Sequence, residues 1–240
     1  MKDVLRKTAA LALVGAMAFG TAACGDKSSS SDSGHSEGNM AAANVSGDVA
    51  EEDLPYGATM TQLLPSINED VPITIELDER FIDQEAGIAV SNYLSALTNA
   101  DAALMEKAFY PPYLKASYEA GGFSSAQEYL DEVQANLFSV IAEHAQKDVD
   151  QITVDYIIVD NCYSEGDAEA GSHFSDMDQI LSDSLGSDFL SKVEEGSRRE
   201  LYVDFTYVLP NDDTSYDYNY GTGYPLRMYL YKIDGQYYVV

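Results

Sequence analysis

Apolar residues recur at two different spacings in this chain, and the order of these spacings constrains the fold. Between residues 82 and 145 they recur every three or four positions, which places them on one face of amphipathic helices. From residue 152 onwards most apolar runs alternate with polar residues, the pattern of half-buried strands. Helices first and antiparallel strands last predict an α+β fold, with N-terminal helices packed on one face of a curved, mainly antiparallel sheet.

The expected helices begin at recognisable residues. Asp101 has the position of an N-cap, and Ser124, with Gln127 three residues later, has the pattern of a capping box. The expected helical segments are residues 82–97, 102–109 (broken by Pro111-Pro112), 113–119, a long helix from 124 to at least 141, and 176–195 (divided at Gly186), with one helical turn over 59–64.

The expected strands have equally clear signals. Asp234-Gly235 is a strong two-residue hairpin signal, and Pro72 favours an edge position for the strand that contains it, because proline has no N–H to donate. The alternating runs are residues 71–77, 152–158, 201–209, 226–230 and 236–240.

The first 24 residues have the layout of an export signal. Lys2, Arg6 and Lys7 precede an apolar run over residues 8–19, and small residues follow directly before Cys24. The run is shorter than the roughly 20 apolar residues that span a bilayer. A cysteine in this place resembles the bacterial lipobox, in which the cysteine receives lipid and becomes the new N-terminus. This resemblance implies a lipoprotein anchored at the extracellular face of the cell membrane through Cys24; the alternative is an ordinary cleaved signal.

Composition divides the rest of the chain. Residues 24–50 are mostly small or polar, so they cannot bury enough surface to offset the entropy of ordering, and we expect a disordered tether behind a signal peptide of residues 1–23. Residues 51–78 are expected to form an N-terminal turn and strand segment. Residues 79–240 form the expected main α+β domain.

Two segments carry a resemblance to a known group of domains. Residues 89–97, followed by Asn99 and Asp101, resemble the opening of nuclear-transport-factor-two-like (SnoaL-like) domains, and residues 231–239 are similar to their closing hairpin. Residues 54–59 also resemble the lead-in of uncharacterised lipoproteins of Firmicutes. The resemblance implies a cone-like domain, a fold that hosts isomerases, cyclases and non-enzymatic binding domains alike, so it does not assign an activity.

The charge excludes one class of partner. The chain has a formal net charge of −28, so the phosphates of nucleic acids would be repelled, and no nucleic-acid partner is expected. The charge either keeps the protein soluble or attracts cations and basic polymers, and both interpretations are open. Only Cys24 and Cys162 are present, so lipidation of the first would leave Cys162 without a disulfide partner, as a small half-buried apolar residue.

Candidates for acid–base chemistry are few. His144, His173, Asp155 and Asp204 lie on expected helices, strands or their connections, but no spacing brings two of them together. We therefore assign no catalytic residue and expect a ligand- or partner-binding module. A small pocket enzyme, an isomerase or hydrolase, is the first alternative, and a calcium-stabilised surface scaffold is the second.

An acidic loop supplies the candidate metal ligands. Residues 211–219 contain Asp212, Asp213 and Asp217, whose carboxylates are the hard oxygen ligands that suit calcium. The loop lacks the glycine of the EF-hand pattern. The other interpretation is an exposed connection rich in turn-forming residues.

Tyrosines gather near the C-terminus. Tyr229 and Tyr231 are expected on the same strand face as Arg227, which makes these three residues the candidate ligand-binding set. They would line a concave sheet face that holds an envelope or extracellular ligand. The alternative is that the rings are cross-strand packing pairs covering the sheet.

Overall fold

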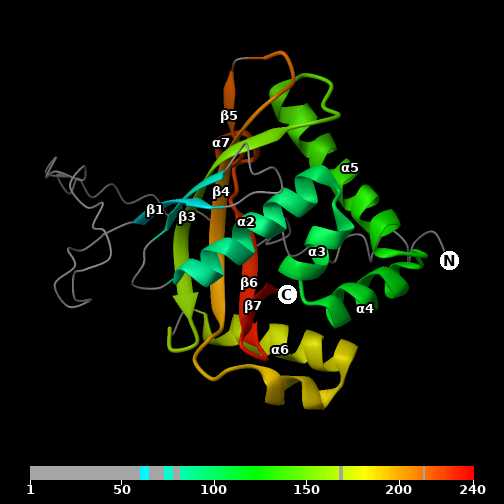
Figure 1. Cartoon of the computed structure of the whole chain (residues 1–240), viewed down its shortest axis with the longest axis vertical. Coiled ribbons are helices and arrows are strands. Elements are labelled where there is room, and N and C mark those ends of the chain that lie inside the picture. Colours follow the sequence, from blue (N-terminus) through cyan, green and yellow to red (C-terminus); the bar gives the residue numbers. More distant parts are fainter. Residues whose placement is uncertain (1–59, 65–72, 78–81, 168–169, 213) are drawn as a thin grey trace, which may run out of the picture.

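The computed structural model describes residues 60–64, 73–77, 82–167, 170–212 and 214–240. They form an α+β domain with helices packed on a curled, half-barrel sheet (Figure 1). This confirms the predicted fold class, including the short N-terminal strand segment. In these ranges no helix is both long and apolar enough to cross a membrane.

The central strand of the sheet is β4 (Arg199–Val208), which pairs with β3 along one side and with β5 and β6 along the other. The strand order of the sheet is β1-β2-β3-β4-β6-β7, and β5 pairs with β4 beside β6. The pairing of β2 with β3 is parallel, and the other pairings between named strands are antiparallel. The strands are β1 Met60–Leu64, β2 Ile73–Leu77, β3 Thr153–Ser164, β4 Arg199–Val208, β5 Ser215–Asp217, β6 Leu226–Ile233 and β7 Gln236–Val239.

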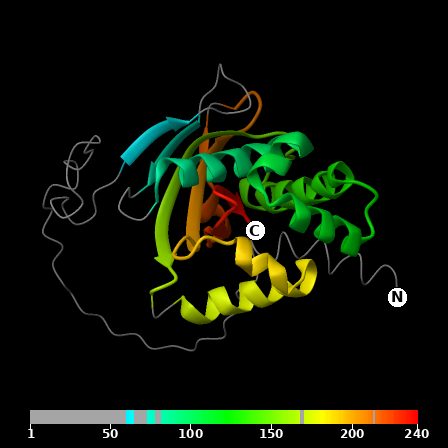
Figure 2. The same ribbon diagram turned by 60° about the horizontal axis from the view of Figure 1, so that its bottom comes forward.

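The helices form two groups around this sheet. Figure 1 shows α2 crossing the sheet with α3, α4 and α5 beside it, and Figure 2 shows α6 apart from them. The helices are α2 Gln84–Asn99, α3 Ala102–Ala108, α4 Pro111–Gly121, α5 Ala126–Ala145, α6 Gly171–Leu185, the 3₁₀ helix η3 Ser187–Lys192 and α7 Tyr218–Thr222.

The main core joins the first group of helices to one sheet face. Leu201, Val203 and Phe205 alternate along β4 and are fully buried in the same apolar cluster as Leu94 of α2 and Leu130 of α5. Burying a side chain of this size stabilises the fold by about 1.5–3 kcal/mol. The alternation read from the sequence therefore identifies the core face of β4 correctly.

A second core lies on the opposite sheet face. Tyr229, Tyr231 and Ile233 of β6 are buried with Phe174 and Leu181 of α6. The N-terminal helices pack on one sheet face, as predicted, but the later helix α6 covers the other face, which the sequence did not indicate. The reason is that α6 is itself amphipathic, so its apolar stripe needs a surface to cover, and the tyrosine-bearing face supplies it.

Several local predictions are confirmed. The Asp101 side chain accepts from the N–H of Leu104 at 2.9 Å, so it caps α3. Asp234 and Gly235 have positive φ angles of 51° and 85°, as a tight hairpin turn of the primed type requires. Gly186 separates α6 from η3, as expected.

Other local predictions need correction. Residues 60–64 form strand β1, paired antiparallel with β2, and not a helical turn. α3 ends before Pro111-Pro112, as predicted, but the next helix begins at Pro111 and not at Tyr113, because the first helical positions need no N–H partner. The cap of α5 is Ser125 and not Ser124: its hydroxyl accepts from the N–H of Glu128, whose carboxylate accepts from Ser124.

The cap of α3 gives a direct test of the local analysis. Asp101→Ala removes the acceptor for the Leu104 N–H, and we expect the free energy of unfolding to fall by about 1 kcal/mol. Glu106→Ala, an exposed position on the same helix, is the control for loss of a carboxylate. Urea denaturation of both variants measures the difference; equal losses would contradict the capping role.

Candidate functional site

The sheet face beneath α6 brings together the predicted ligand-binding residues. The register of β4 and β6 sets Glu200 opposite Tyr229 and Tyr202 opposite Arg227. Directly opposed residues on one face are near neighbours. Arg227, Tyr229 and Tyr231 thus share one face, as the sequence predicts.

Glu200 is the centre of a buried polar network on this face. Its side chain has no exposed surface, and its carboxylate accepts from Arg227 Nε and, at 3.2 Å, from the Tyr202 hydroxyl. Its other oxygen lies 2.9 Å from Nδ1 of His173, in the first turn of α6. Burying a carboxylate without partners is very costly, so Glu200 depends on these contacts.

Arg227 links this network to the aromatic rings. Its guanidinium lies 5.1 Å from the centre of the Tyr229 ring and also donates to the Tyr229 hydroxyl. Burial raises the pKa of Tyr229 far above its ordinary value, although Arg227 opposes the shift, so the phenol stays protonated. The ring also packs edge-on against Phe174 of α6.

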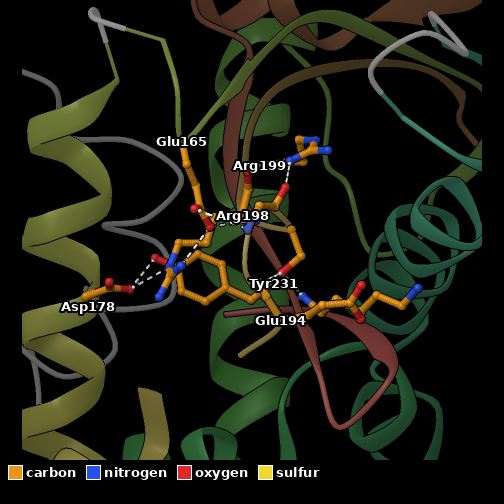
Figure 3. Close-up of polar contacts among 9 residues, drawn as sticks. Glu165, Asp178, Glu194, Arg198, Arg199 and Tyr231 are labelled. Carbon is orange, nitrogen blue, oxygen red and sulfur yellow. Dashed lines mark hydrogen bonds and ion pairs between the residues drawn. The ribbon is translucent and has the colours of Figure 1, made fainter. Parts of the chain in front are cut away.

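A second network, one turn further along α6, repeats the arrangement. Figure 3 shows Arg198 between Glu165 and Asp178, with N–O distances of 2.6 Å and 3.1 Å, and over the ring of Tyr231. The Tyr231 hydroxyl donates to Asp178 at 2.9 Å. Burial raises the pKa of Glu165, but its bonds with Arg198 outweigh this and hold the pKa below its usual value. Both networks therefore fasten α6 to the sheet.

This geometry changes what the tyrosines can do. Tyr229 and Tyr231 are 6% and 0% exposed, and both hydroxyls are engaged by protein groups. They do not line an open face in this structure, which favours the packing interpretation that the sequence left open. A ligand could reach these rings only after α6 had moved away.

The candidate calcium ligands are partly accounted for by protein contacts. Asp212 accepts from Lys147 Nζ, from the Tyr216 hydroxyl at 2.8 Å and from the Thr214 N–H at 3.0 Å. Lys147 supplies the positive charge that calcium would bring, and it holds the pKa of Asp212 well below its usual range. Asp217 lies on β5.

Asp213 lies outside the described residues, and its part in the loop is not tested. Within the residues that the structure describes, no group of three or more His, Cys, Asp or Glu side chains could hold a metal ion. The calcium site stays a prediction.

Asp204 departs from its expected exposure. The alternation of β4 predicts a solvent-facing side chain, yet Asp204 is 5% exposed and accepts from the N–H groups of Phe205 at 2.7 Å and Asn219 at 2.8 Å. The pKa of Asp204 is raised to about 6. Burial is the largest cause of this rise and the charges of Asp217 and Asp160 add to it, while the two N–H bonds oppose it. The sequence missed this because it predicted a loop where β5 and α7 form.

The other titratable candidates lie apart from one another. His144 is exposed on α5, and Asp155 accepts from the Thr206 hydroxyl on β4. His173, by contrast, contacts Glu200. Cys162 is half-buried and packs against the main core, as predicted.

The surface of α5 carries a groove that sequence reasoning did not find. Its volume is about 580 Å³, and its walls are α5, including Phe138 and Ala142, and residues 148–150. Asp148 and Asp150 are exposed and make no hydrogen bond or ion pair with another described residue. A smaller depression of about 230 Å³ lies between α2 and the β6–β7 hairpin.

Comparison with known proteins does not assign the site. No protein-family model, no curated protein and no solved structure matches this chain. The resemblance of residues 89–97 and 231–239 to cone-like domains therefore stays a prediction. The site has to be interpreted from its own geometry.

The Glu200 network makes the first testable prediction for this face. Arg227→Ala leaves the buried carboxylate without its main countercharge, and we expect a loss of about 3 kcal/mol in the free energy of unfolding. The double variant Glu200→Gln with Arg227→Ala removes the charge as well, and should be more stable than Arg227→Ala alone. Chemical denaturation of each variant measures these differences.

Lys115→Ala is the matched control for this experiment. Lys115 pairs with Glu119 at 3.9 Å, and both side chains are largely exposed, so its loss should cost less than about 1 kcal/mol. Equal losses for Arg227→Ala and Lys115→Ala would show that Glu200 does not depend on Arg227.

Asp204 makes the second prediction, a dependence on pH. Its pKa of about 6 in the fold lies above the ordinary 3.8, so the folded state binds the proton more tightly. The stability it contributes is complete below pH 3.8 and is lost as the pH rises through about 6. We expect Asp204→Asn to reduce the fall in melting temperature between pH 4.5 and 7.5, by an amount on the order of a few °C.

Thermal unfolding of both proteins at the two pH values measures this effect. Glu106→Gln controls for the loss of one exposed carboxylate. An unchanged pH dependence in Asp204→Asn would contradict the assignment.

Proposed function

We propose that the protein is a bacterial surface lipoprotein, anchored through Cys24, whose α+β domain is a non-catalytic binding module. The signal layout of residues 1–24 and the composition of residues 25–50 support the anchor and the tether. The observation that carries the binding function is the α5 groove, which combines an apolar wall with two carboxylates that no other described residue uses.

The state of the buried charges also supports binding over catalysis. A general acid or base has to come within hydrogen-bond reach of a substrate. Glu200 already accepts from Arg227 and Tyr202, contacts His173 and has no exposed side-chain surface. Arg198 is held in the same way between two carboxylates. These groups stabilise the packing of α6, whereas Asp148 and Asp150 at the groove have no partner among the described residues.

The two cysteines provide a matched test of the anchor. In cells grown with an alkyne-bearing fatty acid, the wild-type chain and Cys162→Ala should take up label and stay in the membrane fraction. Cys24→Ala should take up none and be released, because it lacks the thiol that accepts the lipid. Labelled, membrane-bound Cys24→Ala would refute the anchor.

A further inference from the structure

The groove on α5 is formed by a reversal of the chain. Gln146 follows α5 with a left-handed φ of 53°, and the N–H groups of Gln146 and Lys147 both bond the Ala142 carbonyl. The chain then turns back beside the helix. Val149 packs against the main core, whereas Asp148 and Asp150 on either side of it are exposed. Asp148 and Asp150 therefore line the groove as alternate residues of one segment.

The opposite wall is a stripe along α5. Gln134, Phe138 and Ala142 follow one another at four-residue intervals, so they lie on the same side of the helix. Phe138 is 6% exposed and packs into the core, so it presents only a small part of its ring to the groove. Ser139 adds a hydroxyl to the same wall.

The charged polar atoms that line the groove are acceptors. One side-chain N–H of Gln134 is used by the Thr98 carbonyl at 2.7 Å, which leaves its second N–H and its carbonyl oxygen. An ionised aspartate can only accept hydrogen bonds, which applies to Asp148 and Asp150, whereas the Ser139 hydroxyl can donate or accept them. The neighbouring Lys147 is directed to Asp212 and Tyr216 and does not neutralise them. A ligand for this groove has to supply donors, positive charge and an apolar stem.

We propose that this groove binds a basic segment of a partner protein with lysine or arginine at alternate positions. It deepens the proposed binding function and rests on it. The aliphatic stems of such side chains lie against Phe138 and Ala142, and their cationic heads reach Asp148 and Asp150. Alternate side chains of an extended peptide point the same way, which matches the alternate spacing of the two carboxylates. The net charge of −28 draws basic segments towards the surface.

The test measures binding of defined peptides to the full chain in nonionic detergent by calorimetric titration. The basic probe is acetyl-Lys-Ala-Lys-Ala-Lys-amide, and the comparison probes replace every lysine by glutamate or by glutamine. A peptidoglycan fragment and spermidine complete the set. We expect the basic peptide to bind with a dissociation constant below about 1 mM at low salt, because exposed charge pairs are individually weak.

Two variants decide whether the groove is responsible. Asp148→Asn with Asp150→Asn should weaken binding at least about fivefold, since it removes both charged acceptors. Ser139→Lys, at an exposed position, places an ammonium group in the groove and should abolish binding. The control, Glu194→Gln with Glu195→Gln, removes the same charge from the exposed turn between η3 and β4 and should change the constant less than twofold.

The remaining outcomes separate failure of the inference from failure of the function. Equal weakening by both double variants would mean that net charge alone attracts the peptide. That result would overturn the assignment of the α5 groove as the binding site. Spermidine binding as tightly as the peptide would overturn the assignment to a protein partner. Binding of only the glutamine peptide, the glutamate peptide or the peptidoglycan fragment would overturn the inference and leave a binding module. Binding of no probe would count against both.

Discussion

The structure depends on charge buried along one face of its central strand. Glu200 and Asp204 lie on the same side of β4, Arg198 directly precedes this strand, and the apolar residues that alternate with them fill the main core. Each of these polar side chains needs a partner from another element, because a buried charge without one is too costly. The partners come from α6, from β6 and from Glu165, just after β3, for Arg198 and Glu200, and from the start of α7 for Asp204. These contacts fix where α6 and α7 lie more specifically than apolar packing would.

The parts of the fold that local chemistry decides could be predicted from the sequence. The Asp101 cap, the Asp234-Gly235 turn and the shared face of Arg227, Tyr229 and Tyr231 all follow from spacing along the chain. Alternation tells which residues share a face, but it does not tell what covers that face. For this reason the sequence could not show that α6 buries the tyrosines or that Asn219 helps to bury Asp204.

The α5 groove could not be predicted from the sequence for a related reason. Asp148-Val149-Asp150 alternates as a short strand might, but nothing local indicates that a left-handed Gln146 folds this segment back along α5. Non-glycine residues adopt that conformation uncommonly. The exposed small residues on α5, Ala135 and Ser139, are the one signal that could have identified the opposite wall, since small residues leave room beside a helix.

The position of β1 and β2 has a mechanical consequence. They form the edge of the sheet, and β2 is joined to the rest by its parallel pairing with β3. In a protein held at its N-terminus, a pulling force would reach this edge pair before any of the described helices. Detaching the pair would lengthen the chain between the point of attachment and the rest of the domain by roughly 3.3 Å per residue released. Because no residue of β1 or β2 lines the α5 groove, this edge could give way without removing a wall of the groove.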